Sequence, residues 1–299
     1  MSQCQREKKT AKPKWLRRSL PTGPEYEKIR QLLKSHDLTT VCQEAHCPNQ
    51  FECYGKGTAT FMILGERCTR NCRFCAVRHQ PESMPDPEEA GRVAEAVVIL
   101  GLRYAVVTSV TRDDLADGGA SFFAETIRRI RESSPKTLVE VLIPDLQGNW
   151  QALRTIIAAG PDVLNHNIET VAGLYPEVRP QALYQRSLEL LRQTKKINAH
   201  LPTKSGMMLG LGETHPELVQ TWHDLLLSGC DILTMGQYLQ PSTDHLPVHR
   251  FLPPEEFAEL QQEALDAGFS GVASGPFVRS SYQAEKLYRQ AVSRIQKSA

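Results

Sequence analysis

The chain has 299 residues, of which 40 % are hydrophobic, and its 35 basic and 34 acidic side chains leave a formal net charge of +1. This length suits one large α/β domain. A nearly neutral chain lacks the basic excess of general nucleic-acid or membrane-surface binders. No apolar run approaches the roughly 20 residues that cross a bilayer, so the sequence predicts neither nucleic-acid binding nor a membrane span.

Residues 1–20 form the one strongly basic stretch, in which Glu7 is the only acidic residue. We expect a solvated, flexible tail. The alternative is an arm that docks on an acidic protein partner. The tail is not followed by the apolar region of a secretory signal, so we expect a cytoplasmic protein.

The chain has eight cysteines, and six of them lie between residues 42 and 75. Cysteines are rarely paired as disulfides in a reducing compartment, so this clustering indicates metal binding. The other two are Cys4, in the tail, and Cys230, whose apolar neighbours predict a buried thiol.

The first cysteine triplet consists of Cys42, Cys47 and Cys53, with four and then five residues between the sulfurs. Three thiolates suggest an iron–sulfur cluster with one ligand that is not cysteine. His46 is adjacent to Cys47, and we expect it at the surface or in a hydrogen bond, because a neighbouring residue usually points away. Residues 21–58 are predicted to form an N-terminal extension that carries this triplet.

The second triplet is Cys68, Cys72 and Cys75, with three and then two residues between the sulfurs. A [4Fe–4S] cluster needs four ligands, and soft thiolates usually supply them. The iron left open can bind the amino and carboxylate groups of S-adenosylmethionine (SAM), which makes these cysteines catalytic as well as metal ligands. Arg70 and Arg73 are candidates for adjusting the charge of the cluster.

Zinc is the competing interpretation of the second triplet. A structural zinc site usually has two close pairs of Cys or His ligands, and only Cys72 and Cys75 are spaced in this way.

From residue 60 on, short apolar runs alternate with amphipathic stretches. Strands are predicted at 60–64, 104–109, 138–143, 163–168, 204–209, 232–235 and 271–273, and helices at 87–100, 121–132, 149–159, 184–196, 216–228 and 254–267. Such strand–helix repeats form a parallel sheet. We predict an α/β fold, a partial (β/α)6-type TIM barrel of the radical SAM class over residues 59–275, with residues 276–299 as a C-terminal extension.

The chain resembles the lipoyl synthase family. Both cysteine triplets stand in the family's order, and residues 107–120, 165–170, 236–242 and 279–282 match further stretches. The similarity runs from about Leu38 to Ala284. It implies insertion of two sulfur atoms at C6 and C8 of a protein-bound octanoyl-lysine, giving lipoyl-lysine. The implied cofactors are SAM, consumed to 5′-deoxyadenosine and methionine, and two [4Fe–4S] clusters, of which the auxiliary one is the sulfur source.

The resemblance also implies that the C-terminal extension, residues 276–299, closes over the auxiliary cluster. Ser280 would be the fourth ligand of that cluster, and Ser281 stays open as the neighbouring alternative. An alkoxide is a hard ligand at a site built for soft sulfur, so this contact should be readily broken. Without the resemblance, residues 279–282 would be interpreted as a loop or a helix start with serine as a cap. Gln283 stands where the family often has histidine.

Contacts to SAM are expected from family likeness and from positions at strand ends. Thr108 and Ser109 are favoured near the methionine end, Asn167 and Glu169 near the ribose, and Met235, Gln237 and Tyr238 near the adenine. Each of these can equally be a structural residue. Arg179, Lys196 and Lys204 are candidate cations for a carboxylate or for the carrier surface. Gly118 and Gly119 are interpreted as a turn.

The implied partners are octanoylated lipoyl carrier domains or the glycine cleavage H protein, and an electron donor such as ferredoxin or flavodoxin; we expect a monomer. One alternative is a radical SAM sulfur or methylthio transferase that acts on RNA or a small molecule, but no basic appended domain is apparent. Another is an electron-transfer or iron–sulfur storage protein, which does not explain why both triplets lack a fourth cysteine.

Overall fold

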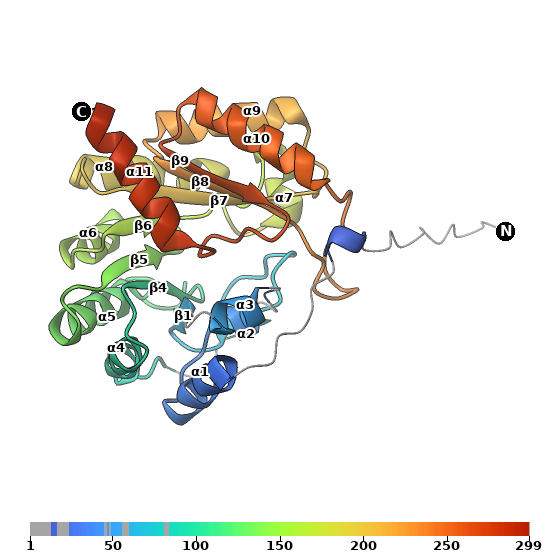
Figure 1. Cartoon of the computed structure of the whole chain (residues 1–299). Coiled ribbons are helices and arrows are strands. Elements are labelled where there is room, and N and C mark those ends of the chain that lie inside the picture. The colour runs from blue at the N-terminus through green and yellow to red at the C-terminus, as the bar shows by residue number, and fades with distance from the viewer. Residues whose placement is uncertain are drawn as a thin grey trace.

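The computed structural model describes residues 13–16, 24–44, 47, 49–55, 60–80 and 84–298, and its central feature is a parallel sheet of seven strands (Figure 1). In spatial order the strands are β1 (Thr60–Ile63), β4 (Tyr104–Ser109), β5 (Leu138–Leu142), β6 (Val163–Asn165), β7 (Thr203–Leu209), β8 (Ile232–Gln237) and β9 (Gly271–Gly275). Spatial order follows chain order, as in a barrel. The terminal strands β1 and β9 are not paired with each other, so the barrel is partial.

A long helix follows each of the first six strands of this sheet. These helices are α4 (Glu89–Ile99), α5 (Ala120–Ser133), α6 (Trp150–Ala158), α8 (Tyr184–Ile197), α9 (His215–Leu227) and α10 (Pro254–Ala267). The predicted partial (β/α)6-type barrel is thereby confirmed. Local sequence explains several of the boundaries: Thr214 and Glu217 form a capping box at α9, and Gly268, at φ 124°, ends α10.

Other elements differ from the prediction or were not predicted. The predicted strand 163–168 ends at Asn165, and β8 continues to Gln237. The structure adds α1 (Pro24–Ser35), α2 (Val41–Glu44), α3 (Gln50–Gly55), α7 (Tyr175–Val178) and α11 (Ala284–Ser298). It also adds a two-stranded parallel sheet of β2 (Arg67–Cys68) and β3 (Arg78–His79), together with 3-10 turns at Lys14–Leu16, Leu146–Gly148 and Ala172–Leu174. Most of the predicted basic tail, Cys4 and His46 lie outside the described residues.

The C-terminal extension packs on the inner face of the sheet. Met235 belongs to the core formed with residues of α9 and α10, on the outer face of the sheet. Successive side chains of a strand point to opposite faces, so Gly236 lies on the inner face. There α11 contacts β8 and β9 (Figure 1). A methyl carbon at residue 236 would lie 2.0 Å from the carbonyl oxygen of Val278, and one at residue 271 would lie 3.0 Å from Cβ of Ala291. Glycine is therefore needed where the chain crosses the sheet.

A Gly236→Ala substitution should destabilise the protein by about 1–3 kcal/mol, because the Val278 backbone has to move away from the new methyl group. Gly91 is the matched control: it lies within α4, and a methyl group there would meet nothing within 4 Å. Gly91→Ala should stabilise the helix slightly. Denaturant unfolding of both variants measures the difference, and equal stabilities would contradict the packing of the C-terminal extension described here.

A buried ion pair lies on the inner face, toward the amino end of β7. Lys204 Nζ lies 2.9 Å from Glu140 Oε1, and both side chains are almost fully excluded from solvent. Tyr104 and Asn165 also donate hydrogen bonds to the Glu140 carboxylate, at 2.6 and 3.0 Å. Lys204 is therefore a structural cation inside the barrel and not part of a carrier surface.

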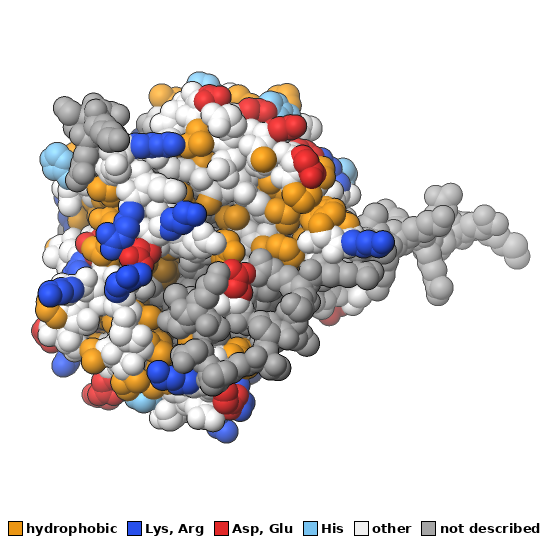
Figure 2. Space-filling model, viewed as in Figure 1, with side chains coloured by type: hydrophobic (Ala, Val, Ile, Leu, Met, Phe, Trp, Pro, Cys, Tyr) orange, Lys and Arg blue, Asp and Glu red, His pale blue; other side chains and the backbone are white. Residues whose placement is uncertain are grey.

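Charges of both signs share the surface seen in Figure 2. Acidic side chains gather over α10, and Lys and Arg side chains lie toward α11 and α5. The face therefore has no single sign of charge, as expected from the net charge of +1. Within the described part of the chain, no helix combines the length and the apolar character that crossing a bilayer requires.

Candidate active site

The loop that carries Cys68, Cys72 and Cys75 is fastened to loops beyond the strand ends. Thr69 N–H donates to the Thr111 carbonyl at 2.9 Å, and Arg73 N–H donates to Val178 at 3.0 Å. In return, Leu246 N–H donates to the Arg73 carbonyl, and His245 Nε2 donates to the Cys75 carbonyl at 2.9 Å. These bonds place the three thiols at the carboxyl end of the barrel, where β/α barrels carry their active sites.

The chemistry of these thiols fits a cluster. Burial raises the pKa of the Cys75 thiol to about 12, and it also raises the pKa of Cys72, where the adjacent Arg179 guanidinium opposes the rise. Thiolates in such surroundings need positive charge beside them, as irons provide. Among the described residues, no three His, Cys, Asp or Glu side chains converge on a single-ion site. A cluster binds each thiolate through a separate iron, so its ligands need not converge in that way.

The structure also brings the first triplet together. Cys42, in α2, is buried; its thiol contacts that of Cys47, and this contact together with burial raises the pKa of Cys42. Cys53, in α3, adds a smaller Coulombic effect of the same sign. None of the three is joined in a disulfide with another described cysteine, so each sulfur can serve as a ligand.

The C-terminal extension contacts the segment that holds the first triplet. Asn49 Nδ2 donates to the Phe277 carbonyl at 2.6 Å, and the Tyr282 hydroxyl donates to Glu52 Oε1 at 3.0 Å. Ser280 lies in the turn between these two contacts. Its hydroxyl donates to Asn167 Oδ1 at 2.8 Å, at the end of the barrel strands. Ser280 thus lies between the segment that carries the first triplet and the strand end at Asn167.

Asn167 and Glu169, which were predicted near the ribose, lie beside the second triplet. Asn167 Nδ2 donates to Glu169 Oε1 at 3.0 Å, and the Glu169 charge acts on the pKa values of Cys72 and Cys75. Glu169 has a φ of 66° and is held by backbone hydrogen bonds to β7 on both sides, at 2.9 Å each. Non-glycine residues in this conformation often mark functional sites. Burial raises the pKa of the Glu169 carboxyl, and Arg179 opposes the rise.

The predicted contacts near the methionine end differ in their availability. The Thr108 hydroxyl donates to the Leu142 carbonyl at 2.9 Å, inside the sheet. The Ser109 hydroxyl is buried, and it has no hydrogen-bond partner among the described residues. A buried polar group without a partner is unusual, so Ser109 is available to a bound molecule.

The three residues predicted near the adenine have structural contacts. Met235 is part of the core. Gln237 Nε2 donates to the carbonyls of Leu209 and Arg250, and its Oε1 accepts from Leu252 N–H. The Tyr238 hydroxyl donates to the Leu246 carbonyl at 2.7 Å. Their role in binding SAM stays a prediction.

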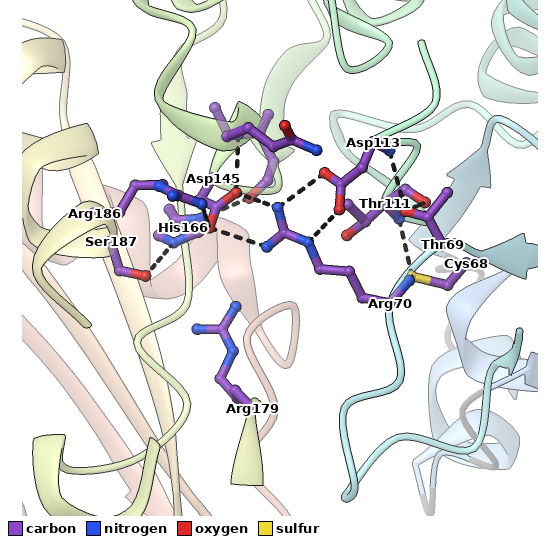
Figure 3. Close-up of polar contacts among 12 residues, drawn as sticks. Cys68, Thr69, Arg70, Thr111, Asp113, Asp145, His166, Arg179, Arg186 and Ser187 are labelled. Atoms are coloured by element: carbon purple, nitrogen blue, oxygen red, sulfur yellow. Dashed lines mark hydrogen bonds and ion pairs between the residues drawn. The ribbon is translucent and has the colours of Figure 1, made fainter. Parts of the chain in front are cut away.

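Sequence reasoning did not predict the ion pairs of Arg70. This side chain is 4 % exposed and lies between two carboxylates: Nε is 2.7 Å from Asp113 Oδ2, and Nη1 is 3.0 Å from Asp145 Oδ2 (Figure 3). His166 lies nearby; burial lowers its pKa to about 4, and its ring bonds to the Ile143 carbonyl and to Ser187. Arg73, by contrast, is half exposed. No sequence signal distinguishes the two arginines.

Gly118 and Gly119 form the predicted turn, with φ of 61° and 88°. The Asp117 carboxylate accepts from Gly119 N–H and Ser121 N–H.

Of the other candidate cations, Arg179 is buried and donates to the Asn167 carbonyl at 3.1 Å, whereas Lys196 is exposed, 3.8 Å from Glu189.

Comparison with known proteins identifies the family. The radical SAM superfamily matches residues 62–225, and the N-terminal domain of lipoyl synthase matches residues 2–47. A lipoyl synthase of Desulfotalea psychrophila is 69 % identical over 283 residues, which cover 95 % of each chain. The chain belongs to the lipoyl synthase family of the radical SAM superfamily. The lipoyl synthase of Symbiobacterium thermophilum is 56 % identical over 95 % of this chain and 88 % of its own. That of Chlorobaculum tepidum is 56 % identical over 92 % of this chain and 94 % of its own.

Membership of this family makes the chain a sulfurtransferase that uses SAM and [4Fe–4S] clusters. Solved structures support the fold alone. The [FeFe]-hydrogenase maturase HydG has a TM-score of 0.56 at 16 % identity, over 90 % of this chain and 70 % of its own. SuiB of Streptococcus suis, solved with S-adenosylmethionine, has a TM-score of 0.55 at 10 % identity, over 73 % of this chain and 51 % of its own.

Proposed function

We propose that this chain inserts two sulfur atoms, at C6 and C8, into an octanoyl chain attached by an amide to a lysine of a carrier domain. The observation that carries the proposal is the arrangement of two cysteine triplets, each without a fourth cysteine, on either side of the segment that holds Ser280. The identity of 69 % with a relative named lipoyl synthase supports it.

We assign Cys68, Cys72 and Cys75 to the cluster that binds SAM, and Cys42, Cys47, Cys53 and Ser280 to the auxiliary cluster. When bound, these groups supply the radical that removes hydrogen from C6 and C8 and the sulfur that replaces it. Hydrogens on such carbons are far too weakly acidic for a side-chain base. The side chains of the protein therefore bind, orient and shield.

Charged and polar groups beside the second triplet are proposed to orient SAM. The backbone of Glu169 is hydrogen-bonded to β7 and its side chain to Asn167, and both side chains are suited to ribose hydroxyls. Ser109 offers a hydroxyl without a partner among the described residues. Arg179 places a buried positive charge beside Cys72 and is suited to offset negative charge there. Fixing reactants in this way converts binding energy into rate.

Apolar side chains behind the cysteine loop are proposed to exclude water. Val178, Tyr238 and Leu246 form a buried cluster, and Phe74, next to Cys75, packs against it. Exclusion of water from this side protects a reactive radical from competing hydrogen donors.

The partners follow from this reaction. We propose a lipoyl carrier domain or the glycine cleavage H protein as substrate, and ferredoxin or flavodoxin as electron donor. Thiols that are to bind clusters have to stay reduced, so we propose that the reaction takes place in the cytoplasm, and we propose that the chain acts as a monomer.

The direct test is incubation of the reduced protein with SAM and an octanoylated lysine peptide. The expected result is 5′-deoxyadenosine together with a peptide that has gained two sulfur atoms, measured by mass spectrometry. Release of 5′-deoxyadenosine without any gain of sulfur would show that the assigned substrate is wrong.

Metal analysis separates this proposal from a chain with one cluster. Two [4Fe–4S] clusters predict about eight irons and eight sulfides per chain. About four of each would remove the sulfur-donor role of the first triplet and favour another radical SAM activity.

A further inference from the structure

Arg70 connects the cysteine loop to two other loops of the barrel. Its guanidinium makes two hydrogen bonds to Asp113, after β4, at 2.7 and 2.9 Å. It also bonds to Asp145, after β5, which is fully buried. Figure 3 shows Arg70 extended between the two carboxylates. We call this arrangement of Arg70, Asp113 and Asp145 the arginine clamp.

The loop segments that the arginine clamp joins also contact the sulfur of Cys68. Two backbone N–H groups donate to this sulfur: that of Arg70 itself, at 3.4 Å, and that of Thr111, at 3.3 Å. Asp113 lies two residues beyond Thr111, and its own N–H donates to the Thr69 hydroxyl at 3.1 Å. Both donors to Cys68 therefore belong to segments that the arginine clamp holds together.

We propose that Arg70 is a positioning residue that sets the reduction potential of the cluster on Cys68, by holding the amides of residues 70 and 111 on its sulfur. This inference rests on the proposed function of the cysteine loop. Hydrogen bonds to cluster sulfurs stabilise the reduced, more negative state and so raise the potential. The clamp keeps the cluster reducible by a cellular electron donor.

The chemistry of the clamp requires arginine. A planar guanidinium can bond two carboxylates at once, whereas an ammonium is a point charge that cannot reproduce the fork. The surroundings keep the clamp in place: Arg186 Nη1 lies 3.6 Å from Asp145, and Asp145 also accepts from Gln147 N–H at 3.0 Å. Arg70→Lys therefore loosens the clamp and keeps the charge, so a change in potential cannot come from a change in net charge.

The test is a redox titration of the full-length holoenzyme. The titration is monitored by the electron paramagnetic resonance signal that SAM perturbs. Arg70→Lys is expected to move the midpoint to a more negative potential, with about tenfold less reduced cluster at a fixed potential, or ~59 mV for a one-electron couple. Arg73→Lys is the matched control, because Arg73 lies in the same loop with a half-exposed side chain. Its midpoint should equal that of the unaltered protein.

Asp113→Glu is the second variant, and it decides the question if Arg70→Lys does not fold. It also keeps the charge, and its longer side chain displaces the loop that holds Thr111, so it should shift the midpoint in the same direction. Midpoints equal to that of the unaltered protein, or an equal shift in Arg73→Lys, would overturn the role of the clamp. A holoenzyme whose signal does not respond to SAM would instead overturn the proposed function on which this inference rests.

Discussion

A Cys47→Ala chain is expected to cleave SAM and to transfer no sulfur to an octanoylated peptide. Cys47 belongs to the first triplet, with Cys42 and Cys53, whereas the loop with Cys68 is anchored by hydrogen bonds to Thr111, Val178 and Leu246. Loss of one ligand from the first triplet should therefore leave the second triplet intact. Chromatography of 5′-deoxyadenosine and mass spectrometry of the peptide measure the two activities separately.

Two further cysteine variants complete this experiment. Cys72→Ala should lose both products, because it removes a ligand from the proposed SAM site. Cys230→Ala should keep both, because Cys230 is buried in the core and its thiol donates to the Ile232 carbonyl, at 3.3 Å. If Cys47→Ala also lost SAM cleavage, the two triplets would not act as separate sites.

The barrel could be predicted from sequence because its strands are short apolar runs with clear ends. The predicted strand 104–109 and the predicted helix 254–267 agree with the bounds of β4 and α10. The helix α10 lies between two residues that stop it, Pro253 and Gly268. Where local sequence determines an element in this way, tertiary contacts change little.

Elements at the termini depend on tertiary packing and were not predicted. In α11 the buried residues Ala284, Leu287 and Ala291 recur at helical spacing, so the sequence contained a signal for this helix; it did not indicate the partner of Leu287 and Ala291, which is the glycine at position 271. A glycine in a strand does not indicate which segment lies against it. Similarly, the end of β6 depends on the turn at Glu169, and a positive φ at glutamate has no sequence signal.

The candidate site was predictable to the extent that spacing identifies ligands. Cysteine spacing selected the two triplets, and strand ends selected Asn167 and Glu169, which lie beside the second triplet. Pairings between distant residues were not predictable. Arg70 and Arg73 both stand between cysteines, but only Arg70 is buried against two carboxylates, from loops 43 and 75 residues away.

Sulfur insertion by a Ser280→Ala chain is expected to fall by about a hundredfold, the upper range for changes around metal sites, while SAM cleavage persists. The physical reason is position: the Ser280 hydroxyl lies at the carboxyl end of the barrel, 2.8 Å from Asn167 Oδ1, on a segment that contacts the first triplet's surroundings. Ser281→Ala is the matched control and should retain most activity. The reverse order of the two variants would assign the ligand to Ser281.

Ser280→Cys tests whether the contact has to be weak. A thiolate is a softer and stronger ligand for an iron–sulfur cluster than an alkoxide, so this variant should retain full iron and sulfide content and resist chelators better than the unaltered protein. If release of the serine ligand is part of sulfur transfer, the same variant should insert sulfur more slowly than the unaltered protein. A Ser280→Cys chain with undiminished insertion would show that a readily broken ligand is not required at this position.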